Sequence, residues 1–171
     1  CLYMSKKIIA AKIHNQTVYS RRLYRADRDM DIESKINALN LYEQRASAAG
    51  SIDEAMGYEG MASRHYFRII SSYLPDDFKI EKRTKNPPTD PTNSLLSFAY
   101  TLLHSEIYTA LEAEGLHPYF GFMHRIRRGH AALASDMIEE FRSVIADPFV
   151  INFINYSGIS TNDFIRYEGN P

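Results

Sequence analysis

The sequence contains a single cysteine, Cys1, among its 171 residues. One thiol cannot form an internal disulfide, so we expect the protein to work in a reducing compartment, the cytoplasm. Because no cysteine lies further along the chain, a cysteine nucleophile and a thiolate zinc site are both excluded. A signal-peptide pattern and an apolar run of about 18 residues are also missing, so the sequence predicts neither secretion nor a transmembrane helix.

Several motifs for nucleotide and metal binding are absent as well. The chain has no glycine-rich phosphate loop, no CxxC pair and no HExxH motif. Its net charge is -1, whereas a strongly basic balance is typical of nucleic-acid-binding proteins. The basic residues are nevertheless clustered, in segments 21–28, 79–85 and 125–128. Because the local field matters more than net charge to a phosphate backbone, nucleic acid remains a possible partner.

Along the chain, the spacing of hydrophobic residues is that of helices. Hydrophobic residues make up 44% and charged residues 24% of the chain, which is ordinary for a globular protein large enough to bury a core. Apolar positions recur at three- and four-residue spacing, with no alternating strand series. Helices are expected over residues 8–22, 30–49, 51–73, 94–114 and 131–145. Segment 149–155 fits a short helix or a strand. We therefore predict a compact all-α domain spanning residues 1–171.

Capping signals mark the helix boundaries. Gly50 ends the second helix, and Ser51 with Glu54 forms a capping box at the start of the third. The other expected N-caps are Asp29 or Asp31 for the second helix and Thr92 or Asn93 for the fourth.

Two segments between helices are expected to be irregular. Residues 75–92 form a loop, because Pro87, Pro88 and Pro91 exclude helix there, and we expect its middle to be mobile. Residues 118–123 form a turn, with one helical turn expected over 119–127.

One imidazole and a set of carboxylates lie close together near the end of the chain. His124 is followed by a basic loop, residues 125–129, and then by Asp136, Glu139 and Glu140 at helical spacing. That spacing places the three carboxylates on adjoining parts of one helix face. This combination suits a hard divalent cation beside a phosphate. Residue type alone favours a structural histidine and a solvated acidic face.

Glu59 has an unusual setting inside a predicted helix. Gly57 and Gly60 flank it, and each glycine there costs up to about 1 kcal/mol relative to alanine. Small residues would let another helix or a nucleic acid approach the backbone closely. A solvated glutamate is the alternative, and residue type alone favours it. Arg64 and His65, just downstream, are candidates to contact phosphate.

Five motifs along the chain carry a family resemblance. They are AKIHNQ (11–16), EGMASRHYF (59–67), NPPTDPTNSLLSFAYTLL (86–103), EGLHPYFGFMH (114–124) and LASDMIEEFR (133–142). In this order they resemble the helical C-terminal catalytic domain of the CRISPR-associated spacer-acquisition integrase family. The family commonly has aspartate where His117 stands, away from its metal ligands. Family members usually carry an N-terminal β-rich domain, and no part of this sequence resembles it.

The resemblance implies a metal site. A glutamate, a histidine and a second acidic residue hold Mg²⁺ or Mn²⁺ in the family, and the matching residues here are Glu59, His124 and Glu139. Asp136 matches a nearby acidic position that supports catalysis, through a second metal or through the DNA. All four are therefore expected to be catalytic residues.

The resemblance also implies a reaction and partners. Metal-dependent transesterification by a DNA 3′-hydroxyl inserts spacer DNA into CRISPR arrays, which serves antiviral defence. The implied partners are prespacer and CRISPR-repeat DNA, a small ferredoxin-like adaptation protein, and further copies in a homodimer or higher oligomer of the full-length protein. Arg64, Arg125, Arg127 and Arg128 are our candidate DNA contacts. The alternatives are a non-catalytic helical DNA-binding or assembly module and a plain metal-dependent nuclease.

Overall fold

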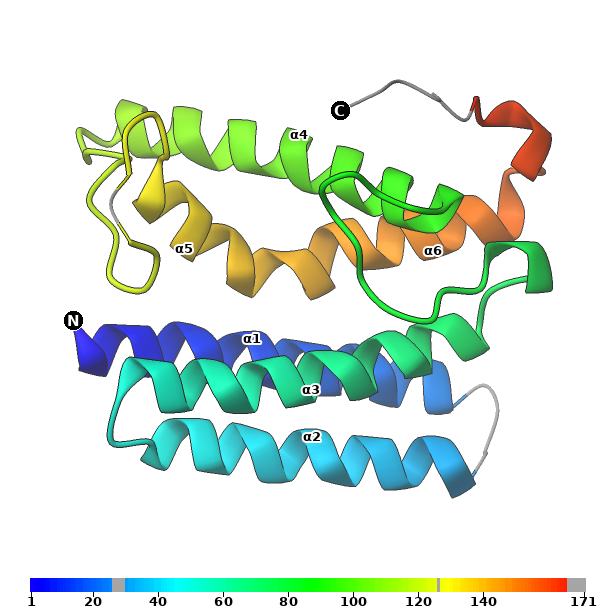
Figure 1. Ribbon diagram of the computed structural model, residues 1–171, viewed down its shortest axis with the longest axis horizontal. Coiled ribbons are helices and arrows are strands. Elements are labelled where there is room, and N and C mark those ends of the chain that lie inside the picture. The colour runs from blue at the N-terminus through cyan, green and yellow to red at the C-terminus, as the bar shows by residue number, and fades with distance from the viewer. Residues whose placement is uncertain (26–29, 126, 166–171) are drawn as a thin grey trace.

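The computed structural model describes residues 1–25, 30–125 and 127–165, and over these ranges the protein is helical without β-strands. Two layers of helices lie against each other, α1–α3 in one and α4–α6 in the other (Figure 1). The helices are α1 (Leu2–Tyr24), α2 (Met30–Ala48), α3 (Ile52–Ser72), α4 (Pro91–Ala113), α5 (Ala132–Phe141) and α6 (Asp147–Tyr156), with short helical turns η1 (Asp76–Phe78), η2 (Arg142–Ala146) and η3 (Thr161–Asp163). The predicted all-α fold is confirmed. None of the described helices combines the length and apolar character needed to cross a bilayer.

Helix α1 is central, because it contacts α2 and α3 in its own layer and α5 in the other. Ile9 and Ile13, four residues apart on α1, are buried together with Leu39 of α2 and Ile69 of α3. Each such side chain contributes about 1.5–3 kcal/mol when it leaves water. Packing from both layers therefore holds α1 firmly, and Lys12, next to Ile13, lies where the layers meet.

The turn between α2 and α3 is capped almost as predicted. Ser51 accepts a hydrogen bond from the Glu54 backbone N–H at 3.1 Å. The Glu54 side chain accepts from Gly50 N at 2.8 Å, one residue earlier than in the expected capping box. Asp31 lies in the first turn of α2, whereas Asp29 lies outside the described residues.

The start of α4 differs from the prediction of a Thr92 or Asn93 cap. The N-cap is Asp90, whose carboxylate accepts from the Asn93 N–H at 2.8 Å. Pro91 is the first helical residue, a position where its missing N–H costs nothing. Asn93 is buried instead and binds Arg83, which connects the loop to α4.

The expected helix over residues 131–145 is not a single α-helix. It ends at Phe141, passes through the π-helical turn η2 and continues directly into α6. Pro148 explains the wider turn, because it lacks an N–H and its ring would clash with the Val144 carbonyl of a regular helix. The same continuity makes segment 149–155 helical, which settles the alternative between helix and strand.

The expected helical turn over 119–127 is absent from the described part of this segment. Its residues form turns that end in an antiparallel bridge between Arg127 and His130. The cause lies in the backbone donors, because the N–H groups of this loop bind the Asp136 side chain instead of one another. The loop is thereby fixed against α5.

Candidate active site

A cleft of about 510 Å³ lies where α1, α3, α4, α5 and the loop before α5 meet. It brings together Glu59, His124 and Glu139, the three residues expected to ligate a metal. Four cationic side chains line the same cleft: Lys12, Arg83, Lys85 and Arg142. Carboxylates, an imidazole and cations therefore share one cavity, although they come from distant parts of the chain.

Lys12 on α1 forms ion pairs with two of the expected metal ligands, Glu59 on α3 and Glu139 on α5. Its Nζ lies 2.5 Å from Glu59 Oε1 and 2.6 Å from Glu139 Oε2. Ser63, one turn after Glu59 on α3, donates a hydrogen bond to the same Glu59 oxygen at 2.7 Å. The two carboxylates thus face each other across a single ammonium group.

These ion pairs keep the buried Lys12 and Glu139 side chains charged. Burial opposes the charged form of Lys12, but the negative charges of Glu139 and Glu59 outweigh it and raise the pKa of the lysine. Burial would raise the pKa of Glu139, but Lys12 and Arg142 lower it instead. Arg142 contributes from 3.1 Å, bound to the other carboxylate oxygen. The result is an ionised glutamate whose side chain is 6% exposed.

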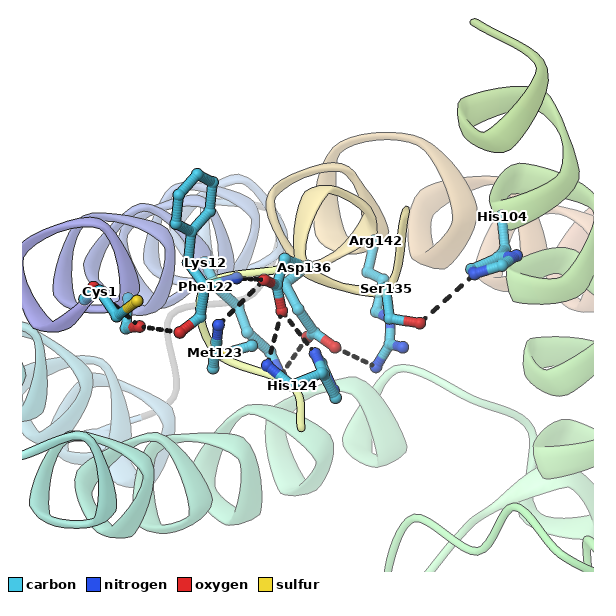
Figure 2. Close-up of polar contacts among 11 residues, drawn as sticks. Cys1, Lys12, His104, Phe122, Met123, His124, Ser135, Asp136 and Arg142 are labelled. Carbon is cyan, nitrogen blue, oxygen red and sulfur yellow. Dashed lines mark hydrogen bonds and ion pairs between the residues drawn. The ribbon is translucent and has the colours of Figure 1, made fainter. Parts of the chain in front are cut away.

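Asp136 is completely buried and organises the loop that carries His124. Its Oδ2 accepts hydrogen bonds from the backbone N–H groups of Phe122 (2.5 Å) and Met123 (3.0 Å). Its Oδ1 accepts from the His124 N–H at 2.9 Å and lies 2.7 Å from His124 Nδ1. Figure 2 shows the Asp136 side chain directed at this loop backbone.

The hydrogen bonds of Asp136 also fix which nitrogen of His124 can bind a ligand. Burial would raise the pKa of Asp136, but hydrogen bonds from His124 and the backbone lower it, so the carboxylate is ionised. An ionised carboxylate only accepts, and therefore His124 Nδ1 carries a proton and donates it. The lone pair of Nε2 is left for a ligand, an arrangement common among metal-binding histidines.

The expected acidic face on α5 is divided by the fold. Asp136 binds the loop, and because it has no exposed surface it does not reach DNA in this arrangement. Glu139 faces the cleft. Glu140 is not among the described residues that line the cleft, and its backbone carbonyl accepts a hydrogen bond from Asn15. Helical spacing alone could not separate these three environments.

An aromatic ring that two arginines contact forms another wall of the cleft. The guanidinium groups of Arg83 and Arg142 lie 5.2 and 4.6 Å from the centre of the Tyr100 ring. The Tyr100 hydroxyl donates to Asp147 Oδ1 at 2.5 Å, and Tyr66 donates to Oδ2 at 2.6 Å. Buried Asp147 thus orients the ring that both arginines contact.

The sequence analysis assigned no role to four residues that hold the site together: Lys12, Tyr100, Arg142 and Asp147. Arg142 could have been found, because it lies three residues after Glu139 on the same helix face. Lys12 stands in the AKIHNQ motif, and its side chain is only 12% exposed, an environment that a lysine rarely occupies without a partner. Tyr100 and Asp147 meet only through packing, and no local signal connects them.

The predicted DNA contacts lie outside the cleft. Arg64 is exposed in a groove of about 490 Å³ that also includes Arg68, Lys82 and Arg83. Arg83, Ser63 and Phe67 line both this groove and the cleft, so the two cavities adjoin. The exposed arginines of the loop after His124 are Arg125, Arg127 and Arg128, while Ile126 lies outside the described residues. Beside Glu59, a Cβ built on Gly57 or Gly60 would meet no described atom within 4 Å beyond the adjoining residues and the nearby backbone of α3 itself, so no neighbouring helix of this chain explains them.

The stability of the fold should depend on pH through Asp147. Burial raises the pKa of this carboxyl to about 6, above the value near 3.9 of an unperturbed aspartate. The folded protein holds the proton more tightly than the unfolded chain. The group therefore stabilises the fold fully below about pH 4, and this contribution is lost as the pH rises through about 6.

We expect the Asp147→Asn substitution to remove this dependence. Between about pH 4 and pH 8, the free energy of unfolding of the variant relative to the wild type should shift in the variant's favour by about 3 kcal/mol. Urea unfolding at several pH values measures it. A difference between the two proteins that stays constant with pH would contradict the assignment.

Among the described residues, no three His, Cys, Asp or Glu side chains form a metal-binding group as they stand. The physical reason is that Lys12 lies between Glu59 and Glu139, while His124 is bound to Asp136. The donors nevertheless fit a divalent cation. Two carboxylates already hold one cation between them, since Lys12 Nζ lies 2.5 Å from Glu59 Oε1 and 2.6 Å from Glu139 Oε2. Carboxylate oxygens are the ligands that Mg²⁺ and Mn²⁺ prefer.

Comparisons with known proteins agree with this fold. Residues 1–170 match the family model described as CRISPR associated protein Cas1. The CRISPR-associated endonuclease Cas1 3 of Thermus thermophilus is 38% identical over 170 residues, which are 99% of this chain and 49% of that protein. A chain of a partial Cas6-RT-Cas1–Cas2 complex has a TM-score of 0.88 and 32% identity, covering 98% of this chain and 50% of that one.

A casposase bound to an integration product is also similar, with a TM-score of 0.81 and 26% identity over 98% of this chain and 46% of that chain. The chain belongs to the Cas1 family. It spans about half the length of the relatives that it matches.

Proposed function

We propose that this chain carries the catalytic site of a metal-dependent DNA endonuclease and integrase that inserts spacer DNA into CRISPR arrays. The observation that carries the proposal is the convergence of Glu59, His124 and Glu139 on one cleft that cationic side chains also line. Two relatives support it. The Thermus thermophilus protein is named an endonuclease, and the similar casposase is bound to an integration product.

Glu59, His124 and Glu139 would hold Mg²⁺ or Mn²⁺, which supplies positive charge to the phosphoryl oxygens and to the attacking hydroxyl. In the joining step, the 3′-oxygen of the incoming strand forms a bond to phosphorus. The bond from that phosphorus to the 3′-oxygen of the target strand breaks. The attacking hydroxyl loses its proton and the departing oxygen gains one, so bonds and protons balance without an outside energy source.

The chain's own residues prepare this step. Asp136 holds the His124 ring in one orientation through the 2.7 Å contact with Nδ1. Arg142 holds Glu139, and Ser63 holds Glu59. Because these supports lie on the helices themselves, the ligands are positioned before substrate arrives, which lowers the reorganisation that catalysis requires.

DNA phosphates would meet positive charge both inside and beside the cleft. Arg83 and Lys85 line the cleft, and Arg64 lies in the adjoining groove. Such contacts position a DNA backbone without reading its sequence. We propose prespacer and repeat DNA as the substrates.

The proposed partners extend beyond this chain. The similar structure named above contains Cas1 together with Cas2. We propose a small ferredoxin-like adaptation protein as the partner here, and a homodimer or higher oligomer in the full-length protein, acting in the cytoplasm.

The loop after His124 gives a prediction about DNA binding. Arg125→Ala combined with Arg128→Ala should weaken DNA affinity and lower the slope of log affinity against log salt by about 2, because each phosphate contact contributes about 0.9. Fluorescence anisotropy at several salt concentrations measures the slope. Arg45→Ala, an exposed change on α2, is the control. An unchanged slope in the double variant would remove this loop from the interface.

A plain nuclease is the second candidate, because the Thermus thermophilus relative is named an endonuclease. Water in place of the DNA hydroxyl would then break the same bond. The test uses a labelled duplex with free 3′-hydroxyl ends and a supercoiled plasmid that carries a CRISPR repeat, with Mn²⁺ or with EDTA. Metal-dependent transfer of label to relaxed plasmid supports the integrase. Relaxation without label indicates a nuclease, and DNA binding without either product indicates a non-catalytic module.

A further inference from the structure

Lys12 occupies the position between two carboxylates that the proposed function assigns to a metal. Its Nζ contacts Glu59 at 2.5 Å and Glu139 at 2.6 Å. The lysine side chain is 12% exposed, and it lines the cleft together with both glutamates. The ammonium group thus connects α1 with α3 and α5.

The charge balance of the cleft explains why this lysine is there. Two mostly buried carboxylates cannot remain ionised without a nearby positive charge, since desolvation of an unpaired charge is expensive. Lys12 supplies that charge to both, and Arg142 adds a second to Glu139. A divalent cation bound to the same oxygens would lie directly against the ammonium group. Contact of Glu59 and Glu139 with Lys12 and contact with the metal are therefore mutually exclusive.

We propose that Lys12 competes with the metal for the same two carboxylates. In the metal-free protein its ammonium group binds Glu59 and Glu139, and when the cation enters, the lysine side chain moves so that this group binds a DNA phosphate instead. This inference rests on the proposed function, because it takes the metal ligands from there. Lys12 is a positioning residue in this scheme. It keeps the carboxylates together and delays metal binding until DNA is present.

The exchange couples two binding events. Without DNA, the displaced ammonium group has only water as a partner, and the other cations of the cleft, Arg83, Lys85 and Arg142, repel it. A phosphodiester in the cleft offers it a new partner of opposite charge. DNA should therefore strengthen metal binding, and by linkage the metal should strengthen DNA binding by the same factor.

The test measures Mn²⁺ affinity directly, through the electron paramagnetic resonance signal of free aqueous Mn²⁺. Lys12→Met keeps the apolar stem of the side chain and removes the charge. Without DNA, this variant should bind Mn²⁺ about tenfold more tightly than the wild type, because a positive charge next to the site is gone. Lys12→Gln, which keeps a hydrogen-bond donor, should also bind more tightly. Lys7→Met, an exposed change on the same helix, should leave the affinity unchanged.

A short DNA duplex provides the second measurement. It should raise the Mn²⁺ affinity of the wild type by a larger factor than that of either Lys12 variant. If the wild type binds Mn²⁺ and both variants bind it equally or more weakly, the inference about Lys12 is wrong while the metal site stands. If neither the wild type nor the variants bind Mn²⁺, the metal site of the proposed function fails and the role of Lys12 fails with it. If the two Lys12 variants bind Mn²⁺ and the wild type does not, the result would support competition between Lys12 and the metal.

Discussion

The Glu139→Gln substitution is expected to lower the rate of strand joining by at least about a hundredfold. Glutamine has the size of glutamate, but it lacks the charge that holds a cation in the cleft. Glu139 is nearly buried, and its two oxygens face Lys12 and Arg142. DNA affinity should change by no more than a few-fold, since the cationic side chains remain. The rate of label transfer into plasmid and the anisotropy of labelled DNA measure the two effects separately.

Neighbouring substitutions separate this effect from a general loss of structure. Glu140→Gln is the matched control, because it removes the same charge one residue away on α5, and joining should proceed at close to the wild-type rate. Glu59→Ala and His124→Ala should abolish strand joining as Glu139→Gln does, because Glu59 and His124 are the other two proposed metal ligands. Wild-type joining by these three variants would show that the reaction takes place elsewhere.

The Gly121→Ala substitution is expected to lower the free energy of unfolding by about 2–4 kcal/mol. A Cβ at this position would lie 2.6 Å from Asp136 Oδ2 and 2.8 Å from the Ala132 carbonyl carbon. The backbone of α5 cannot yield, so the loop must move away from Asp136. That movement breaks the hydrogen bonds of Phe122 and displaces His124, and strand joining should fall with stability. Urea unfolding measures the change.

Gly57→Ala on α3 is the control for this prediction. Beyond the adjoining residues and the nearby backbone of α3 itself, no described atom lies within 4 Å of the added Cβ. Alanine favours a helix interior, so stability should stay constant or rise by up to about 1 kcal/mol. A Gly121→Ala protein as stable as the wild type would mean that the loop does not lie against α5 as described.

The helices could be predicted because their signals are local. Apolar spacing and capping residues such as Ser51 located them, and the Ser51 cap is present in the structure. The errors arose where local rules compete with each other. Pro91 was counted as a helix breaker, although proline is favoured at the first helical position. The helix expected over residues 131–145 does not stop there, because the π-helical turn η2 lets the chain continue past Pro148 into α6.

The candidate site was only partly accessible from sequence. Motif resemblance selected Glu59, His124 and Glu139, and the fold places all three on one cleft. Their assignment as metal ligands remains a prediction. The bridging position of Lys12 depends on the packing of α1 against both layers, which no short pattern encodes. The same is true of Asp147, whose tyrosine partners lie 47 and 81 residues away in the sequence.

Strand joining with blocked DNA ends tests the central claim most directly. Two labelled duplexes, one with 3′-hydroxyl ends and one with dideoxy ends, are incubated with the protein, Mn²⁺ and a supercoiled plasmid carrying a repeat. We predict that label from the hydroxyl duplex alone becomes covalently attached to the plasmid, and that EDTA or Glu139→Gln prevents it. Plasmid that acquires no label from either duplex would contradict the integrase function proposed for this cleft.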